Sequence, residues 1–494
     1  MSIFSAHAAL WRPLAQASRS PRGRQAVDVG DLLIKAGIVL AGALILVVAY
    51  RLAPWQEARD ILLYSSTGRA MAYAGAIYGS FSAVWTFWRL YLAIRYRPVP
   101  TVEESRLPAI TVIVPAYNEG ALVGQTLRHL AAADYPADRM QIIVVDDGSE
   151  DDTWSHIESA AEEIGPRISA IRCPTNRGKR WALWEGFRRA TGEIFVTVDS
   201  DSLIARDALP ALVSPLVEDA SVGAVAGKVA ALNLDGGLIP RMLNMRYVMT
   251  FDYKRAAQSK MGGGMVLCCA GALAAYRRTA VMPILDKWLH QTFRGGPARA
   301  GEDHAMTNFI LRQGHKVRYQ RSARVVTNSP TKFTGLCKMF LRWGRSNIRE
   351  SIHTGRYIFT SFRPERKIGI RFNYLMGALG LFLPYPFLIC ALVLGLFLPS
   401  IFGLKLLASC VVGSLLSIVF CALRERTSEA LFMVPYSFYS TFLLWWIWPY
   451  ALLTCQKSVW MTRTTKHAPA APGPAPSLAP AMTPPPVPAL ASAR

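Results

Sequence analysis

Hydrophobic residues gather at both ends of the chain, while the middle alternates short apolar runs with polar turns. Near the N-terminus, residues 32–50 and 70–88 form two apolar runs, each of a length typical of a membrane-spanning helix. Three more follow at 372–399, 401–423 and 431–455. Arginines flank the outer ends of the first pair, which predicts a membrane hairpin with both ends in the cytoplasm. The pattern predicts a polar domain held between membrane segments.

The C-terminal apolar segments conflict with the charges that follow them. Three crossings from a cytosolic domain would leave the C-terminus outside, yet Lys457, Arg463 and Lys466 favour the inside. A proline pair could convert one segment into a hairpin or a re-entrant piece: Pro384 with Pro386, or Pro435 with Pro449. We therefore expect a cytosolic C-terminus. The Ala/Pro-rich, almost uncharged tail from about residue 468 predicts disorder.

The middle of the chain alternates strand and helix patterns. Apolar, β-branched runs at 109–115, 141–145 and 193–198 predict buried strands, and 121–132 and 179–190 predict helices between them. This order is typical of an α/β fold with a doubly wound, parallel sheet. In such sheets the ligand lies beyond the carboxyl ends of the strands. Because a polar turn follows each predicted strand, we expect the functional site there.

The third predicted strand ends in two carboxylates, Asp199 and Asp201. At this spacing both project from the same side of an extended chain. Two anions so close favour a hard divalent cation, Mg²⁺ or Mn²⁺, which would in turn hold a diphosphate. The alternative interpretation is an ordinary solvated turn.

The turns after the first two strands suit a nucleoside. Asp146 and Asp147 offer oxygens that accept from a ribose hydroxyl or a base N–H. Tyr117 and Glu119 are candidates for the same pocket. The alternative is an Asx turn that opens the helix capped by residues 151–153.

Two predicted helix starts carry charges suited to group transfer. Lys179 and Arg180 open one helix, where two cations and the helix N-terminus favour an anion such as a diphosphate. Glu302 and Asp303 follow Gly301 at the start of another. Sugar transfer needs a base that takes the proton of the acceptor hydroxyl, and Asp303 is the candidate, with Glu302 beside it. The alternatives are solvated cations and acids that only stabilise a helix N-terminus.

Residues 333–367 alternate apolar and basic side chains, which predicts amphipathic helices in the membrane interface. A solvated surface helix is the alternative. Arg342 and Trp343 lie in this stretch. A Trp face can stack on a sugar ring, and an adjacent Arg can hold a leaving diphosphate. The alternative for Trp343 is an anchor among lipid headgroups.

Composition narrows the class of protein. The 494 residues are 52% hydrophobic and carry a formal net charge of +22, which suits anionic lipid headgroups and nucleotide substrates. No recognised nucleic-acid-binding module is present and many cations flank apolar runs, so we expect no nucleic-acid partner. The eight cysteines lack metal-ligand spacing, which argues against zinc or a disulfide framework and for a cytosolic middle domain.

In this order, the motifs resemble the processive family 2 membrane glycosyltransferases, which include hyaluronan, cellulose and chitin synthases. The hyaluronan and nodulation chitooligosaccharide synthase branch looks closest, on these segments: VIVPAYNE (112–119), VVDDGS (144–149), GKRWAL (178–183), VDSDS (198–202), AAQS (256–259), GED (301–303) and RWGRSNIRE (342–350). Two further segments are similar to that branch's acceptor loop and to its element after the last membrane segment: CCAGALAAYRR (268–278) and SVWMTR (458–463).

The resemblance implies a nucleotide-sugar-binding GT-A fold and a role for each matched residue. The implied contacts are Tyr117, Glu119 and Asp147 with uridine; Lys179, Arg180 and Arg342 with the diphosphate; Asp199 and Asp201 with UDP and the metal; Asp303 as the base; and Gly271 and Trp343 with the acceptor.

The implied enzyme is an inverting, metal-dependent hexosyltransferase of the bacterial inner membrane. It would extend a β-linked polysaccharide from a cytosolic UDP-sugar and pass the polymer through its own channel. Two rivals remain: a non-processive transferase that adds one sugar to a lipid carrier, and a polysaccharide-export subunit with an inactive domain.

Three departures from the family pattern lie on the acceptor side. Met339 stands where the family has Gln, His304 stands where it has Arg, and residues 270–272 (Ala-Gly-Ala) replace Ser-Gly-Pro. They leave the UDP-sugar expectation standing, and they leave open the sugar, the linkage and the product length.

These features predict six regions, with UDP-sugar, growing polysaccharide and membrane lipid as partners. The regions are a basic cytosolic N-terminus (1–30), a transmembrane hairpin (31–98), a GT-A domain (105–330), interfacial amphipathic helices (331–368), a C-terminal transmembrane region (369–456) and a cytosolic tail (457–494).

Overall fold

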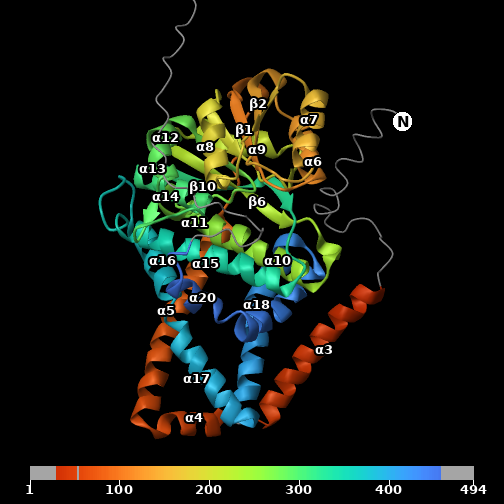
Figure 1. The fold of residues 1–494 in the computed structure, drawn as a ribbon. Helices are drawn as coiled ribbons and strands as arrows, with labels where there is room; N and C mark the ends of the chain where they lie inside the picture. The colour runs from red at the N-terminus through yellow and green to blue at the C-terminus, as the bar shows by residue number, and fades with distance from the viewer. Residues whose placement is uncertain (1–28, 53–54, 458–494) are drawn as a thin grey trace, which may run out of the picture.

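The computed structural model describes residues 29–52 and 55–457 (Figure 1). A sheet with helices packed against it occupies the upper half of the view, and long apolar helices extend below it. Most of the predicted basic N-terminus and of the predicted tail, and the 458–463 motif, lie outside the described residues.

One half of the main sheet is parallel, as predicted. The sheet has eight strands in the order β3-β2-β1-β4-β7-β6-β10-β5. The three predicted strands are confirmed as β1 (Ile110–Ala116), β2 (Met140–Asp146) and β4 (Ile194–Thr197). β1 pairs in parallel with both β2 and β4, and β3 (Ile168–Arg172) extends this half on the far side of β2. The carboxyl ends of β1, β2 and β4 therefore meet at one edge.

The other half of the sheet is mixed, so the prediction of a parallel sheet is wrong there. β7 (Ala274–Arg277) runs antiparallel to both of its neighbours, β4 and β6 (Val222–Ala231). β10 (Lys316–Thr327) is parallel to β6, and β5 (Ser202–Ile204) closes the edge antiparallel to β10. The turn before β7 thus arrives beside the carboxyl end of β4.

The two predicted helices are present within one residue of their expected ends. They are α6 (Ala121–Ala131) and α8 (Lys179–Arg189). The other helices of this domain include α7 (Thr153–Ile164), α9 (Ala208–Glu218), α13 (Leu285–Leu289) and α14 (Glu302–Arg312).

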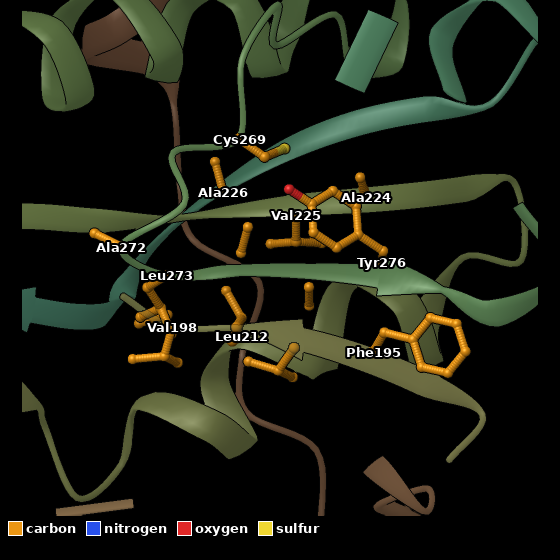
Figure 2. Packing of buried hydrophobic residues seen from close by; sticks show 14 of the residues in the cluster. Phe195, Val198, Leu212, Ala224, Val225, Ala226, Cys269, Ala272, Leu273 and Tyr276 are labelled. Atoms are coloured by element: carbon orange, nitrogen blue, oxygen red, sulfur yellow. The ribbon is translucent and has the colours of Figure 1, made fainter. Parts of the chain in front are cut away.

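Buried hydrophobic side chains pack together between β4, β7, β6 and α9 (Figure 2). Phe195 of β4 and Val225 of β6 are inaccessible to solvent, and Tyr276 of β7 is only 2% exposed. Burial of each such side chain stabilises the fold by roughly 1.5–3 kcal/mol. The same packing fixes the turn that follows β4 and the turn that precedes β7, and both turns carry predicted site residues.

A layer of helices separates the sheet from the apolar helices (Figure 1). It contains α10 (Leu238–Val248), the π-helical turn η4 (Met249–Arg255), and α15 (Phe333–Gly355). The predicted amphipathic stretch is therefore one helix over its first two thirds, and its remainder forms turns. Because Arg349 and Glu350 of α15 are at most 2% exposed, the solvated-helix alternative is wrong.

Three helical segments within the described residues are long and apolar enough to cross a membrane: α3 (Val29–Leu52), the α16–α17 pair (Ile368–Phe397) and α18 with the turn before it (Pro399–Glu425). The last predicted apolar segment is bent by 48° between Ser428–Leu443 and Ile447–Leu453 (α20). Such a bend is compatible with either one broken span or a re-entrant piece, and it lies in the segment that contains Pro435 and Pro449.

The predicted second span of the N-terminal hairpin, residues 70–88, does not form a separate helix of that length. Residues 70–88 lie within a single long helix, α5 (Ser66–Arg95). α5 is not one of the three segments that are long and apolar enough to cross a membrane. A short helix, α4 (Trp55–Tyr64), lies between α3 and α5.

A buried carboxylate fastens the apolar helices to the sheet domain. Asp252 of η4 is inaccessible to solvent and pairs with Lys228 of β6 at 2.8 Å and Arg321 of β10 at 2.5 Å. Lys228 also pairs with Glu425 at the end of α18, at 2.6 Å. Burial alone would raise the pKa of Asp252, but the two cations hold it below its ordinary value. The layer between sheet and membrane segments is therefore anchored by charge.

Candidate active site

The polar turns after β1 and β2 border an open cleft of about 950 Å³. Its walls include Tyr117, Gly148 and Ser149 from these turns, and Arg177 and Trp181 from the start of α8. The Arg177 guanidinium lies over the Trp181 ring, 3.2 Å from its centroid. Cation and aromatic faces with this volume suit a nucleotide.

Asp147 shapes the cleft by holding the loop before α8. Its two carboxylate oxygens accept the backbone N–H groups of Arg177 at 2.9 Å and Gly178 at 2.7 Å. Gly148 adopts a positive φ of 73°, and a Cβ there would lie 2.7 Å from the carbonyl carbon of Thr175. Burial raises the pKa of Asp147 to about 6, although the two N–H groups oppose the shift. Both carboxylate oxygens of Asp147, which was predicted to bind uridine, thus accept hydrogen bonds from this loop.

Glu119 joins the turn after β1 to the turn after β4. Its Oε1 accepts the Ser200 hydroxyl at 2.7 Å, while the Thr153 hydroxyl accepts its backbone N–H at 2.7 Å. Asn118 supports this turn at a positive φ of 50°. The structure therefore brings the predicted nucleoside residues to the same edge as Asp199 and Asp201.

Lys179 lies at the centre of a charged cluster that also contains Asp199, Glu302 and Asp303. Its Nζ pairs with Asp199 Oδ1 and, at 3.0 Å, with Glu302 Oε1. Burial alone would lower the pKa of Lys179, but these carboxylates raise it above its ordinary value. A Cβ on Gly271 would lie 3.0 Å from this Nζ and 3.2 Å from Asp199 Oδ1. The loop before β7 thus closes directly over the ion pair.

Asp303 lies next to this cluster and is held by three donors. Its Oδ1 accepts the His304 N–H at 2.8 Å, and its Oδ2 accepts the Gly271 N–H at 3.3 Å and the Cys268 thiol at 3.7 Å. Burial and the neighbouring Glu302 raise the pKa of Asp303. The pKa of Glu302 is lowered, because Lys179 outweighs the effect of burial. The two acids therefore differ in role: Glu302 pairs with the cation, and Asp303 is the stronger base.

Because Gly301 has no side chain, the turn that leads into Glu302 and Asp303 can approach α15 closely. It adopts a left-handed φ of 82°, and a Cβ there would lie 1.9 Å from the Ser346 hydroxyl oxygen. The Arg349 guanidinium donates to the Ala300 carbonyl on the same turn. α15 is thereby fixed against the start of α14.

α15 carries Arg342, the predicted diphosphate ligand, and Trp343, the predicted acceptor residue. The Trp343 ring is 5.7 Å from the Phe340 ring and 6.5 Å from the Tyr247 ring, between centroids. Arg342 is close enough to Glu302 to contribute to the lowering of its pKa. Arg342 therefore lies near Glu302, while Trp343 packs among aromatic side chains of α10 and α15.

One predicted residue, Arg180, is placed differently from expectation, and the structure also shows the state of His304. Arg180 Nη1 donates to the Trp288 carbonyl at 2.7 Å and to Gln291 Oε1 at 3.1 Å, so its guanidinium is engaged by α13 and the residues that follow it instead of by the Asp199 cluster. His304, at the position of the family's Arg, has its pKa lowered to about 4 by burial, so it is neutral near pH 7.

The residues after β4 fit a divalent cation in donor type. Asp199 and Asp201 supply the carboxylate oxygens that Mg²⁺ and Mn²⁺ prefer, and Asp201 Oδ1 also accepts the Thr327 hydroxyl at 3.2 Å. No group of three or more His, Cys, Asp or Glu residues that could hold a metal exists within the described ranges. An ion here would complete its shell with phosphate oxygens and water, as Mg²⁺ commonly does.

Some of these residues were not singled out from the sequence, although they lie inside the matched segments 342–350 and 268–278. Ser346, which faces Gly301, has an unremarkable position in a helix, and Cys268 lacks any metal or redox spacing. The glycine of the GED motif was the only available sign that another element approaches this turn.

Comparison with known proteins agrees with this geometry. The family described as "Glycosyltransferase like family 2" matches residues 108–346. An N-acetylglucosaminyltransferase of Mesorhizobium japonicum is 31% identical over 72% of this chain and 82% of its own. One from Rhizobium meliloti is 32% identical over 73% of this chain and 83% of its own.

Among solved structures, the mannosyltransferase PcManGT from Pyrobaculum calidifontis, in complex with GDP-Man and Mn²⁺, matches with a TM-score of 0.45 and 23% identity. The match covers 73% of this chain and 97% of that one. The mixed sheet, the polar turns at its edge and the sequence relatives lead to one conclusion: the chain belongs to glycosyltransferase family 2 and is a sugar-transferring enzyme with a GT-A-like fold.

Proposed function

We propose that this inverting family 2 glycosyltransferase polymerises a β-linked polysaccharide from UDP-N-acetylglucosamine and passes the polymer through the membrane. The observation that carries the proposal is the cluster in which Lys179, Asp199, Glu302 and Asp303 meet beside the nucleotide-sized cleft. N-acetylglucosamine is the sugar that the names of the two relatives supply.

Transfer by inversion needs one base and one displacement. Asp303 takes the proton of an acceptor hydroxyl as that oxygen attacks the anomeric carbon of the donor sugar. The new bond to the acceptor oxygen forms while the bond to the diphosphate oxygen breaks, and UDP leaves with the electron pair. Lys179 and Arg342 stabilise the charge that develops on the diphosphate.

A divalent cation fits the same proposal. Asp199 and Asp201 would hold it, and it would neutralise charge on the diphosphate oxygens. Lys179 already neutralises Asp199, so the protein itself limits the repulsion between this carboxylate and the phosphates.

The membrane path is proposed from the position of α15. This helix carries Trp343, whose ring lies beside the Tyr247 ring, and it contacts α20 of the bent segment below it. An aromatic face at the start of such a path suits a sugar chain that leaves the site. Segments long and apolar enough to cross a membrane belong to the same chain as the site. One protein could therefore both transfer the sugar and move the polymer across the membrane.

Donor and metal use can be tested with the purified protein in lipid nanodiscs. We expect release of UDP from UDP-N-acetylglucosamine, at a much lower level from UDP-glucose and not at all from GDP-mannose. EDTA should abolish release, and excess Mg²⁺ or Mn²⁺ should restore it. Release that persists in EDTA would refute the metal assignment, and preference for GDP-mannose would refute the uridine assignment.

A further inference from the structure

Glu350 is a buried acid whose carboxylate is held by two amide side chains. It lies on α15 and is only 2% exposed. Gln291 Nε2 donates to its Oε1 at 3.0 Å, and Asn308 Nδ2 donates to its Oε2 at 2.9 Å. A carboxylate away from water is costly unless hydrogen bonds satisfy it. Because the two donors belong to different elements, Glu350 joins both of these elements to α15.

Gln291 connects Glu350 to a second buried charge. Its Oε1 accepts a hydrogen bond from Arg180 Nη1 at 3.1 Å, while its Nε2 donates to Glu350. Arg180 and Gln291 are at most 8% exposed. Since a guanidinium only donates and a carboxylate only accepts, the amide fits between them in one orientation. A buried cation, which lines the nucleotide-sized cleft, is thus linked to a buried acid that lies outside it.

Gln291 is also the root of a hairpin that forms one wall of this cleft. In this β8–β9 hairpin, β8 (Thr292–Phe293) pairs antiparallel with β9 (Gly296–Pro297). The Ala298 N–H donates back to the Gln291 carbonyl at 2.9 Å. Residues 297–299 of the returning arm line the open cleft of about 950 Å³. The Gln291 side chain therefore anchors a wall of the predicted nucleotide site.

The two amides depend on Glu350 to different degrees. Asn308 Nδ2 also donates to the Glu350 carbonyl at 3.2 Å, and its Oδ1 accepts the Tyr357 hydroxyl at 2.7 Å. Among the described residues, the Gln291 side chain has hydrogen bonds with Arg180 and Glu350 alone. Loss of the Glu350 carboxylate should therefore loosen the β8–β9 hairpin more than α14, the helix that carries the candidate base.

We propose that Glu350 is a positioning residue for donor binding, which acts through Gln291 by holding the β8–β9 hairpin against the nucleotide cleft. This inference rests on the proposed use of a nucleotide sugar and goes beyond it, because Glu350 is not among the residues that line the cleft. Without the carboxylate, the hairpin would keep its apolar contact with α15, where the Phe293 ring lies 6.0 Å from the His353 ring. It would lose its polar anchor, so donor affinity should fall while the chemical step stays intact.

A reciprocal exchange of the acid and the amide tests the proposal in the full-length protein in nanodiscs. In Glu350→Gln one acceptor oxygen remains for two amide donors, and in Gln291→Glu two carboxylates face each other. Each single variant should raise the Kd for UDP on the order of tenfold, the lower end of what a hydrogen bond to a charged group contributes. Their kcat with UDP-N-acetylglucosamine should stay nearly unchanged. The double variant Gln291→Glu/Glu350→Gln should recover the unmodified Kd, because the relocated acid accepts from both Arg180 and the relocated amide.

Two further variants complete the design. Glu162→Gln is the matched control, since it makes the same chemical change at an exposed position of α7, and it should leave the Kd for UDP unchanged. Gln291→Met keeps the test available if Glu350→Gln does not fold, because it removes the anchor at the hairpin and leaves Glu350 bound to Asn308. We expect it to raise the Kd as much as Glu350→Gln does.

The proposal is overturned if Glu350→Gln or Gln291→Met binds UDP as tightly as the unmodified protein. It is equally overturned if Glu350→Gln lowers kcat alone, or if the exchanged pair fails to recover UDP affinity. UDP binding requires no transfer, so a protein that binds UDP but transfers no sugar would defeat the proposed function and leave this result standing. If the unmodified protein binds GDP and not UDP, the uridine assignment fails, and the same variants decide the role of Glu350 with GDP.

Discussion

Replacement of Asp303 by Asn is expected to lower kcat by about 10³-fold while the affinity for UDP stays the same. The side chain keeps its size and its amide oxygen can still accept the His304 N–H, at the loss of the longer contact from Gly271, but an amide cannot take the acceptor proton. The measurement is single-turnover transfer from labelled UDP-sugar, alongside titration of UDP. Because burial and Glu302 raise the pKa of Asp303, the acid limb of kcat/KM in the unmodified enzyme should lie above the ordinary range of an aspartate.

The matched control is Asp286→Asn, which changes an exposed carboxylate on the neighbouring helix α13 and should leave kcat unchanged. Transfer by the Asp303 variant at more than a tenth of the unmodified rate would remove Asp303 from the role of base. Loss of UDP affinity in the same variant would indicate a disturbed fold in place of a lost base.

Replacement of Gly301 by Ala is expected to abolish most of the activity without removing or adding any charged group. The added Cβ would lie 1.9 Å from Ser346 Oγ and 2.6 Å from Ser346 Cβ, and the left-handed backbone disfavours any side chain. Either α15 or the start of α14 must shift, and such overpacking costs about 1–3 kcal/mol. A displacement of about 1 Å at the base costs on the order of 10²-fold in rate, which the same transfer measurement would detect.

A second substitution distinguishes this clash from a general loss of stability. Ser346→Gly removes both atoms that the new Cβ meets, so the Gly301→Ala/Ser346→Gly double variant should recover activity relative to Gly301→Ala. Ser346→Gly alone should cost about 1 kcal/mol of helix stability and little activity. A double variant that is no more active than Gly301→Ala would show that contact between α14 and α15 does not position Asp303.

Local patterns were sufficient to predict the half of the sheet that carries the site. The β-branched runs that became β1, β2 and β4 are buried on both faces, and each ends in polar residues where the chain must leave the sheet. The meeting of Lys179 with Asp199 was also predictable, since both belong to turns at the carboxyl edge of a parallel sheet.

The remaining features depend on partners that are distant in sequence. β7 consists of four residues, two of which are alanines. Such a short run shows no alternating hydrophobic pattern and does not indicate whether the strand is parallel or antiparallel to its neighbours. Asp147 was predicted as a ligand of uridine, and only the fold shows that the loop at Arg177 and Gly178 engages its oxygens. Arg180 is adjacent to Lys179 in the sequence, but the helix turns its guanidinium toward Trp288.

The product made from UDP-N-acetylglucosamine tests the central claim most directly. The purified protein in nanodiscs, with Mg²⁺ and radiolabelled donor, should yield a ladder of soluble saccharides in which a β-specific hydrolase releases the label. Such a ladder would show repeated, inverting transfer onto a growing chain. Label confined to single sugars on extractable lipid, or chains resistant to the β-specific enzyme and sensitive to an α-specific one, would contradict it.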